Sequence, residues 1–117
     1  IVQTVCSEVQ PLNNLSVMHY LKGDMGLDDE AYGDWYGHWI DRGFQAIETW
    51  LADRESGSFC HGDAPGLADC YLVPQVYNAE RFECDLAPYP RIREIVARCR
   101  ALPAFSRAAP ESQPDAP

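Results

Sequence analysis

Positively charged residues are scarce in this sequence of 117 residues, which has 9 lysines and arginines against 18 aspartates and glutamates. The formal net charge is therefore −9. Nucleic acids and anionic membrane surfaces require basic patches on a protein that binds them, so we expect neither as a partner. The sequence also lacks an apolar run of the ~20 residues that span a bilayer, and we expect no membrane segment.

The chain has five cysteines and no Cys-x-x-Cys pair. Because an odd number does not suit a disulfide framework, we expect reduced thiols in a cytosolic protein. A zinc site at Cys60, His61 and Cys70 is the alternative, but the spacing matches no common ligand pattern, so we assign no metal ligand. A nucleophile paired with a base and a glycine-rich phosphate loop are also lacking, and we assign no catalytic residue in this chain.

Apolar residues recur at helical spacing through most of the chain, without β-alternation or internal repeats. The pattern predicts helices over 1–22, 28–54, 66–81 and 90–102, with a last short turn at 104–108. Such a series predicts an all-α fold, a bundle of about five helices around the helix 66–81. We expect one helical domain over 1–109 and an extended, proline-rich tail over 110–117.

The predicted helix 66–81 is the most informative element of the sequence. Gly66 precedes Asp69 by three residues, which is the spacing of a capping box, so we assign both to the start of this helix. Apolar residues surround almost the whole helix, a pattern that predicts burial on all sides. Pro74 lies inside it and predicts a kink near Tyr71 or an early stop.

Pro11 interrupts the first predicted helix, and three amide side chains lie close to it in sequence: Gln10, Asn13 and Asn14. A proline frees a backbone carbonyl in the preceding turn. The residues alone leave two interpretations open. The amides either satisfy the broken backbone hydrogen bonding or face a ligand at the interruption.

Arg81 ends the otherwise apolar helix 66–81. A guanidinium can hold a carboxylate through two parallel hydrogen bonds, and in a chain of charge −9 an anionic ligand needs such a local positive group. The alternative role is structural. Arg81 then pairs with Glu80, Glu83 or Asp85, or caps the carboxyl end of the helix.

The stretch LADCYLVPQVYNAERFECDLAPYP resembles the C-terminal domain of the glutathione transferases. It is most similar to the zeta class, which comprises the maleylacetoacetate isomerases and the related bacterial maleylpyruvate isomerases. The segments VQPLNNLSVMHYL, LPAF and QPDAP are similar to the same class, so the resemblance covers nearly the whole chain. Gly66 stands where the class usually has threonine, a change that costs only a few tenths of a kcal/mol at a helix N-cap.

This resemblance implies a cytoplasmic, homodimeric isomerase with glutathione as cofactor and a small dicarboxylic or keto-acid substrate. It implies that Asn13 and Asn14, with Gln10, lie near glutathione, and that Arg81 binds the acidic substrate. In the family an N-terminal thioredoxin-like domain activates the thiol. We expect that domain to be absent from this chain, and the chain alone to be inactive.

Two other functions remain open at this point. One is a general glutathione transferase that conjugates or dehalogenates small electrophiles on the same scaffold. The other is a non-catalytic helical interaction domain.

Overall fold

The computed structural model describes residues 1–53 and 57–116. Its elements are η1 (Thr4–Val9), α1 (Gln10–Asn13), α2 (Leu15–Gly23), α3 (Asp29–Ala52), α4 (Leu67–Arg81), α5 (Pro90–Arg100), α6 (Pro103–Ala108) and η2 (Pro110–Ser112). Within those ranges the chain has no strand, so the predicted all-α fold is confirmed. The predicted end of the second helix near Arg54 lies outside the described residues.

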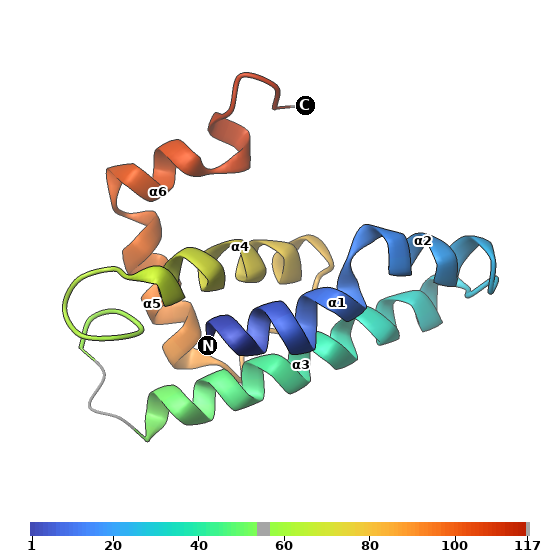
Figure 1. The fold of residues 1–117 in the computed structure, drawn as a ribbon, viewed down its shortest axis with the longest axis horizontal. Coiled ribbons are helices and arrows are strands. Elements are labelled where there is room, and N and C mark those ends of the chain that lie inside the picture. The colour runs from blue at the N-terminus through green and yellow to red at the C-terminus, as the bar shows by residue number, and fades with distance from the viewer. Residues whose placement is uncertain (54–56, 117) are drawn as a thin grey trace.

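The long helix α3 forms one side of the bundle, and η1, α1 and α4 lie over it in Figure 1. Helix α5 crosses beside α4, and α6 leads away from the bundle toward the C-terminus. In the part of the chain that the structure describes, we find no helix with the length and hydropathy of a membrane span.

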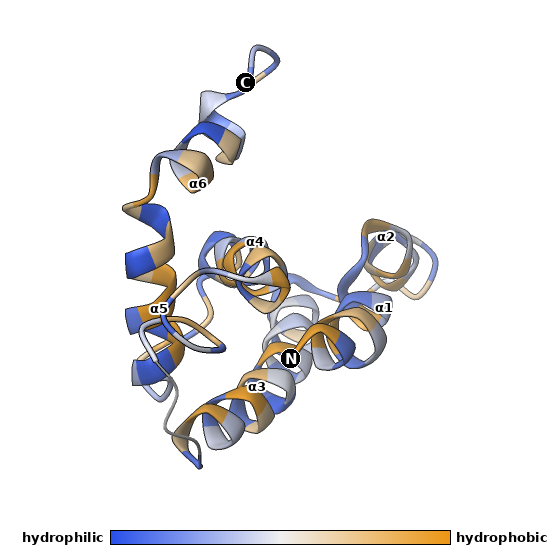
Figure 2. Cartoon of the chain, turned by 60° about the vertical axis from the view of Figure 1, so that its left-hand side comes forward, coloured by the Kyte–Doolittle hydropathy of each residue, from blue (hydrophilic) through white to orange (hydrophobic). Residues whose placement is uncertain are grey.

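The core lies where η1, α3, α4 and α5 meet. Its buried apolar side chains include Val5, Val9, Ile40, Phe44, Ile47, Leu51, Leu72, Val76, Ala79, Ile92, Ile95, Val96 and Cys99. In α5 these residues recur at helical spacing, and the hydrophilic bands of that helix face away from the bundle in Figure 2. Helices α3 and α5 therefore each bury one face, as the amphipathic pattern of the sequence predicts.

Side chains with oxygen acceptors begin two of the longer helices. Asp28 is the N-cap of α3, and its carboxylate accepts the N–H of Ala31 at 2.8 Å. At α4 the N–H of Gly66 donates to Asp69 Oδ2 at 2.8 Å, which confirms the half of the predicted capping box that Asp69 makes; glycine has no side chain for the other half. Both contacts satisfy backbone groups that have no partner inside a helix.

Helix α5 begins at Pro90, and a carboxylate from α3 supplies its cap. The two oxygens of Glu48 accept the N–H groups of Arg91 and Ile92 at 2.9 and 3.0 Å. Just before this helix, the hydroxyl of Tyr89 donates to Asp41 of the same α3. Polar contacts from α3 thus hold the start of α5, in addition to the core packing.

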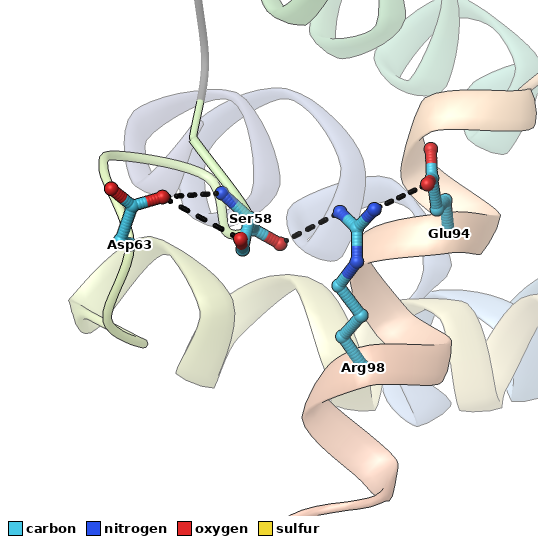
Figure 3. Close-up of polar contacts among 4 residues, drawn as sticks. All are labelled: Ser58, Asp63, Glu94 and Arg98. Atoms are coloured by element: carbon cyan, nitrogen blue, oxygen red, sulfur yellow. Dashed lines mark hydrogen bonds and ion pairs between the residues drawn. The ribbon is translucent and has the colours of Figure 1, made fainter.

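The segment that leads into α4 is tied to α5 by the contacts in Figure 3. Asp63 accepts the N–H of Ser58 at 3.2 Å, and the carbonyl of Ser58 accepts from Arg98 at 3.0 Å. The guanidinium of Arg98 also pairs with Glu94 one turn earlier in α5. The segment before α4 is therefore held by a hydrogen bond within itself and by a second one to α5.

Helix α4 differs from the sequence prediction in two respects. It continues through Pro74 to Arg81, so of the two effects predicted for this proline the early stop is wrong, and the kink near Tyr71 stays a prediction. Pro74 and Cys70, whose carbonyl loses its helical partner, are both exposed, so water can satisfy that carbonyl. The helix is also not buried on all sides, because the face that carries Cys70 and Pro74 is exposed.

The tail begins with the single 3-10 turn Pro110–Ser112. The backbone around that turn is extended, with ψ angles of 142° at Ala109 and 150° at Gln113. The boundary between domain and tail at residue 109 stays a prediction.

Candidate functional site

The first helix breaks at Asn14, three residues after Pro11. Residues Thr4–Val9 are π-helical, and Asn14 is extended with a ψ of 160°. Pro11 cannot donate to the carbonyl of Ser7, and its ring pushes against the preceding turn, which widens the helix there. The predicted interruption is thus present, although the chain turns at Asn14 instead of at the proline.

Asn14 is the N-cap of α2, and both ends of its side chain are engaged. Its Oδ1 accepts the N–H groups of Ser16 and Val17 at 3.0 and 3.2 Å, and the Ser16 hydroxyl at 2.6 Å. Its Nδ2 donates to the carbonyls of Pro11 and Gln10 at 2.8 and 3.4 Å. These contacts match the interpretation in which the amide satisfies the broken backbone.

Asn13 has a different environment. Its Nδ2 donates to the backbone carbonyl of Tyr36 in α3 at 3.3 Å. Its Oδ1 is buried and has no partner among the residues that the structure describes. A buried acceptor without a partner is rare in proteins and is the kind of atom that a ligand donor satisfies. Gln10, on the same segment, has an exposed side chain.

Arg81 is the last residue of α4 and is exposed. Glu80 pairs instead with Arg100, at 2.7 and 2.9 Å, and Asp85 accepts the N–H of Ala87 at 2.9 Å. Within residues 1–53 and 57–116, the guanidinium of Arg81 makes no ion pair or hydrogen bond that would support the structural alternative. It therefore remains available to an anion.

Tyr36 lies between these two segments. Its ring stacks on that of Phe82, with centroids 3.6 Å apart and an angle of 4° between the planes. Burial raises the pKa of Tyr36 to about 12; the neighbouring Cys84 also raises it, and Arg81 acts in the opposite direction. Phe82 directly follows Arg81, so this stack places the end of α4 against the tyrosine whose carbonyl holds Asn13.

The turn after Arg81 has a strained backbone. Glu83 has a φ of 55°, and it is the one non-glycine residue of the described ranges with a positive φ. The N–H groups of Cys84 and Glu83 donate to the carbonyls of Ala79 and Glu80, both at 3.0 Å. This is a Schellman motif, in which the left-handed position is usually glycine. A side chain there costs roughly 1 kcal/mol.

Asp69 has a second role beyond the capping box. It is 1% exposed, and its Oδ1 accepts the N–H of Cys60 at 3.0 Å and the thiol of Cys99 at 3.7 Å. Burial, together with this carboxylate, raises the pKa of Cys99 to about 12 and raises that of Cys60 as well. Both thiols are therefore held protonated and are poor nucleophiles and metal ligands at neutral pH.

The residues considered for zinc are not gathered into a site. Cys60 is buried, whereas His61 and Cys70 are exposed. In the part of the chain that is described, no group of three or more histidine, cysteine, aspartate or glutamate side chains could hold a metal ion.

A groove of about 810 Å³ lies between α4 and the segment formed by α6 and η2. Its apolar lining includes Val73, Pro74 and Phe105, and its polar lining includes Glu80 and Arg100. The groove is formed by the face of α4 that the sequence predicts to be buried. Helix α6, which borders it, has no buried residue of its own.

Sequence patterns did not single out Tyr36 or Gln75. Tyr36 belongs to a wide aromatic stripe of α3 that is typical of core packing, and only the fold shows that it joins two candidate binding segments. Gln75 is 1% exposed in α4, and its Oε1 has no partner among the described residues. A glutamine on the apolar face of a helix was the available signal.

Comparisons with known proteins agree with this fold. The probable maleylacetoacetate isomerase of Vibrio cholerae is 50% identical over 112 residues, which are 96% of this chain and 52% of that protein. A solved maleylpyruvate isomerase, described as a bacterial glutathione transferase of the zeta class, superposes with a TM-score of 0.96. It is 48% identical, and the match covers 99% of this chain and 55% of that one.

A third match is the maleylacetoacetate isomerase of Anaeromyxobacter dehalogenans, with dicarboxyethyl glutathione and citrate bound in its active site. It has a TM-score of 0.91 and 46% identity over 99% of this chain and 51% of that one. No model of a protein family matches the chain.

The fold and these similarities place the chain among the glutathione transferases. It belongs to the zeta class of that family, to whose C-terminal helical domain it corresponds. The chain spans about half the length of the curated relatives that it matches.

Proposed function

We propose that the chain is the substrate-binding part of a glutathione-dependent isomerase that converts maleylacetoacetate or maleylpyruvate from the cis to the trans form. The observation that carries the proposal is the arrangement around Tyr36. Asn13, on the segment proposed for glutathione, donates to the carbonyl of this residue, and Arg81, proposed for the substrate, directly precedes Phe82, whose ring stacks on it. Relatives with the same fold are named as isomerases of these two compounds.

Arg81 is proposed to hold a substrate carboxylate. It has the chemistry for bidentate binding, it is exposed at a helix end, and no acidic side chain of the described residues occupies it. The chain has a net charge of −9, so it offers an anionic substrate few positively charged groups other than Arg81. The citrate in one related structure is likewise a carboxylate ligand.

Asn13 and Gln10 fit a role in binding glutathione. The unpartnered Oδ1 of Asn13 would accept an N–H of the cofactor once the segment opens to it, and Gln10, three residues earlier, presents an exposed amide. Asn14 is already engaged on both ends, so its proposed contribution is to hold the shape of the segment. Glutathione, when bound, supplies the thiol whose reversible addition to the cis double bond allows that bond to rotate.

The residues of this chain serve positioning and charge neutralisation in this reaction. Arg81 fixes the carboxylate end of the substrate and neutralises its charge through two parallel hydrogen bonds. The stacked rings of Tyr36 and Phe82 hold the end of α4 that carries this arginine. Thiol activation is proposed to come from a thioredoxin-like N-terminal domain.

That second domain is the proposed occupant of the groove between α4 and α6. The groove is lined mainly by apolar side chains, and exposed apolar patches of this kind usually mark a missing contact. Full-length relatives contain about twice the residues present here. We also propose a homodimer, on the family resemblance alone, and a cytoplasmic location, in keeping with the free cysteines.

The test is an isomerisation assay with the full-length protein, with and without glutathione, on maleylacetoacetate and on maleylpyruvate. We expect turnover of at least one compound that depends on glutathione, with no net consumption of glutathione. Conjugation of haloacids without isomerisation would instead identify a general glutathione transferase. A full-length protein that neither binds glutathione nor turns over either substrate would be an interaction domain.

A further inference from the structure

We propose that Tyr36 is a positioning residue that couples the proposed glutathione segment to the proposed substrate arginine. The inference builds on the proposed function and adds a residue to which neither the sequence pattern nor the names of the relatives assign a role. Tyr36 contacts no reacting group. It acts by fixing where Asn13 and Arg81 lie relative to each other.

The first step of the argument concerns the segment around Asn13. Two consecutive residues of α3 hold it. The indole N–H of Trp35 donates to the carbonyl of Leu12 at 2.9 Å, and the carbonyl of Tyr36 accepts from Asn13 at 3.3 Å. The position of this segment therefore depends on the part of α3 that carries Tyr36.

The second step concerns the end of α4. Phe82 is its C-cap residue, directly after Arg81, and stacks on Tyr36 at 3.6 Å with the two rings nearly parallel. Tyr32, one turn earlier in α3, lies farther from Phe82, at 6.2 Å and a tilt of 33°. The close contact between α3 and this end of α4 is thus made by the ring of Tyr36.

The third step is the strain at Glu83. A non-glycine residue at a φ of 55° persists only where the surrounding structure holds it. The stack of Phe82 on Tyr36 provides such a restraint on the residue immediately before it. Without the stack, the turn can relax and the last turn of α4, with Arg81, can shift. A shift of about 1 Å at a binding group is enough for a large kinetic effect.

The experiment compares Tyr36→Leu, Tyr36→Phe and Phe44→Leu in the full-length protein. Tyr36→Leu removes the stacked ring, and Tyr36→Phe keeps it. Phe44→Leu is the matched control, because Phe44 is an equally buried aromatic residue of α3 that packs on Tyr89 instead. The measured quantities are KM and kcat for the cis substrate, and amide hydrogen exchange at residues 12–14 and 81–84.

We expect Tyr36→Leu to raise KM for the acidic substrate about tenfold with kcat within about twofold, because binding of the carboxylate is weakened equally in ground and transition states. Exchange at residues 12–14 and 81–84 rises in the same variant. Tyr36→Phe restores both properties, and Phe44→Leu leaves KM unchanged. If Tyr36→Leu does not fold, Phe82→Leu removes the stack from the other side with the same expected result.

A KM for Tyr36→Leu equal to that of Phe44→Leu would overturn the inference, since the ring would then serve stability alone. Hydrogen exchange separates this failure from failure of the proposed function. If the wild-type protein shows no isomerisation, faster exchange in both segments of Tyr36→Leu still supports the coupling. Unchanged exchange in those segments overturns it.

Discussion

The carboxylate of Asp69 accepts the backbone N–H of Cys60 at 3.0 Å while its other oxygen accepts that of Gly66 at 2.8 Å. One buried side chain thus closes the loop before α4 and begins the helix. This combination explains why a carboxylate is buried in the core although it has no ion-pair partner among the residues that the structure describes.

Replacement of Asp69 by alanine is predicted to destabilise the protein by about 3 kcal/mol. The estimate adds about 1 kcal/mol for the lost cap to about 2 kcal/mol for the buried N–H of Cys60 left without an acceptor. Urea denaturation of the full-length protein measures the change. Asp63→Ala is the matched control, because Asp63 accepts the N–H of Ser58 in the same loop but is exposed. Equal losses in the two variants would contradict this account of Asp69.

Gly43 and Gly33, both in α3, are predicted to respond to alanine with opposite signs. A Cβ at Gly43 would lie 2.3 Å from Val9 Cγ2, so Gly43→Ala separates η1 from α3 and costs about 1–3 kcal/mol. A Cβ at Gly33 meets nothing within 4 Å, so Gly33→Ala gains up to about 1 kcal/mol of helix propensity. Thermal unfolding of the two variants measures both effects. A neutral Gly43→Ala would mean that η1 does not pack as closely as described.

Replacement of Glu83 by glycine is predicted to stabilise the protein by about 1 kcal/mol, because glycine adopts the left-handed conformation without strain. Glu83→Ala keeps a Cβ and serves as the control, with no gain expected. Chemical denaturation measures the free energy of unfolding of the two variants. A gain in the alanine variant as large as in the glycine variant would point to the lost charge instead of the backbone.

Alkaline pH is predicted to destabilise the fold through its buried acids. Burial and Asp69 raise the pKa of Cys99 from 9.0 to about 12, so the folded state holds this proton more tightly than the unfolded state. The contribution is complete below about pH 9 and is lost as the pH rises toward 12. The urea concentration at the midpoint of unfolding should therefore fall as the pH rises through this range. The Cys99→Ala variant should show a smaller fall. The same smaller fall in a variant of the exposed Cys70 would exclude this origin.

Much of the fold could be predicted because its signals are local. The capping contact between Gly66 and Asp69 and the helix starts predicted at residues 28 and 90 each depend on a few neighbouring residues. Pro74 misled the prediction because the cost of a proline depends on what covers that face of the helix. The predicted burial of α4 on all sides reflected its composition, whereas one of its faces is exposed.

The candidate site was less accessible to sequence reasoning. Asn13 and Asn14 look equivalent in sequence. The side chain of Asn14 caps a helix, whereas Asn13 has a buried oxygen acceptor without a partner among the described residues. The place of Tyr36 depends on a contact with Phe82 across 46 positions of the chain, and no local pattern encodes such a contact. Whether Asn13, Gln10 and Arg81 bind ligands stays a prediction.

Steady-state kinetics of Arg81→Ala in the full-length protein tests the central claim most directly. Loss of a charge-assisted carboxylate contact is predicted to raise KM for the cis substrate by about ten- to a hundredfold, with little change in KM for glutathione. Arg93→Ala, an exposed arginine of α5, provides the control and should match the wild type. An Arg81→Ala protein with the KM and kcat of the wild type would contradict the assignment of the substrate site to the end of α4.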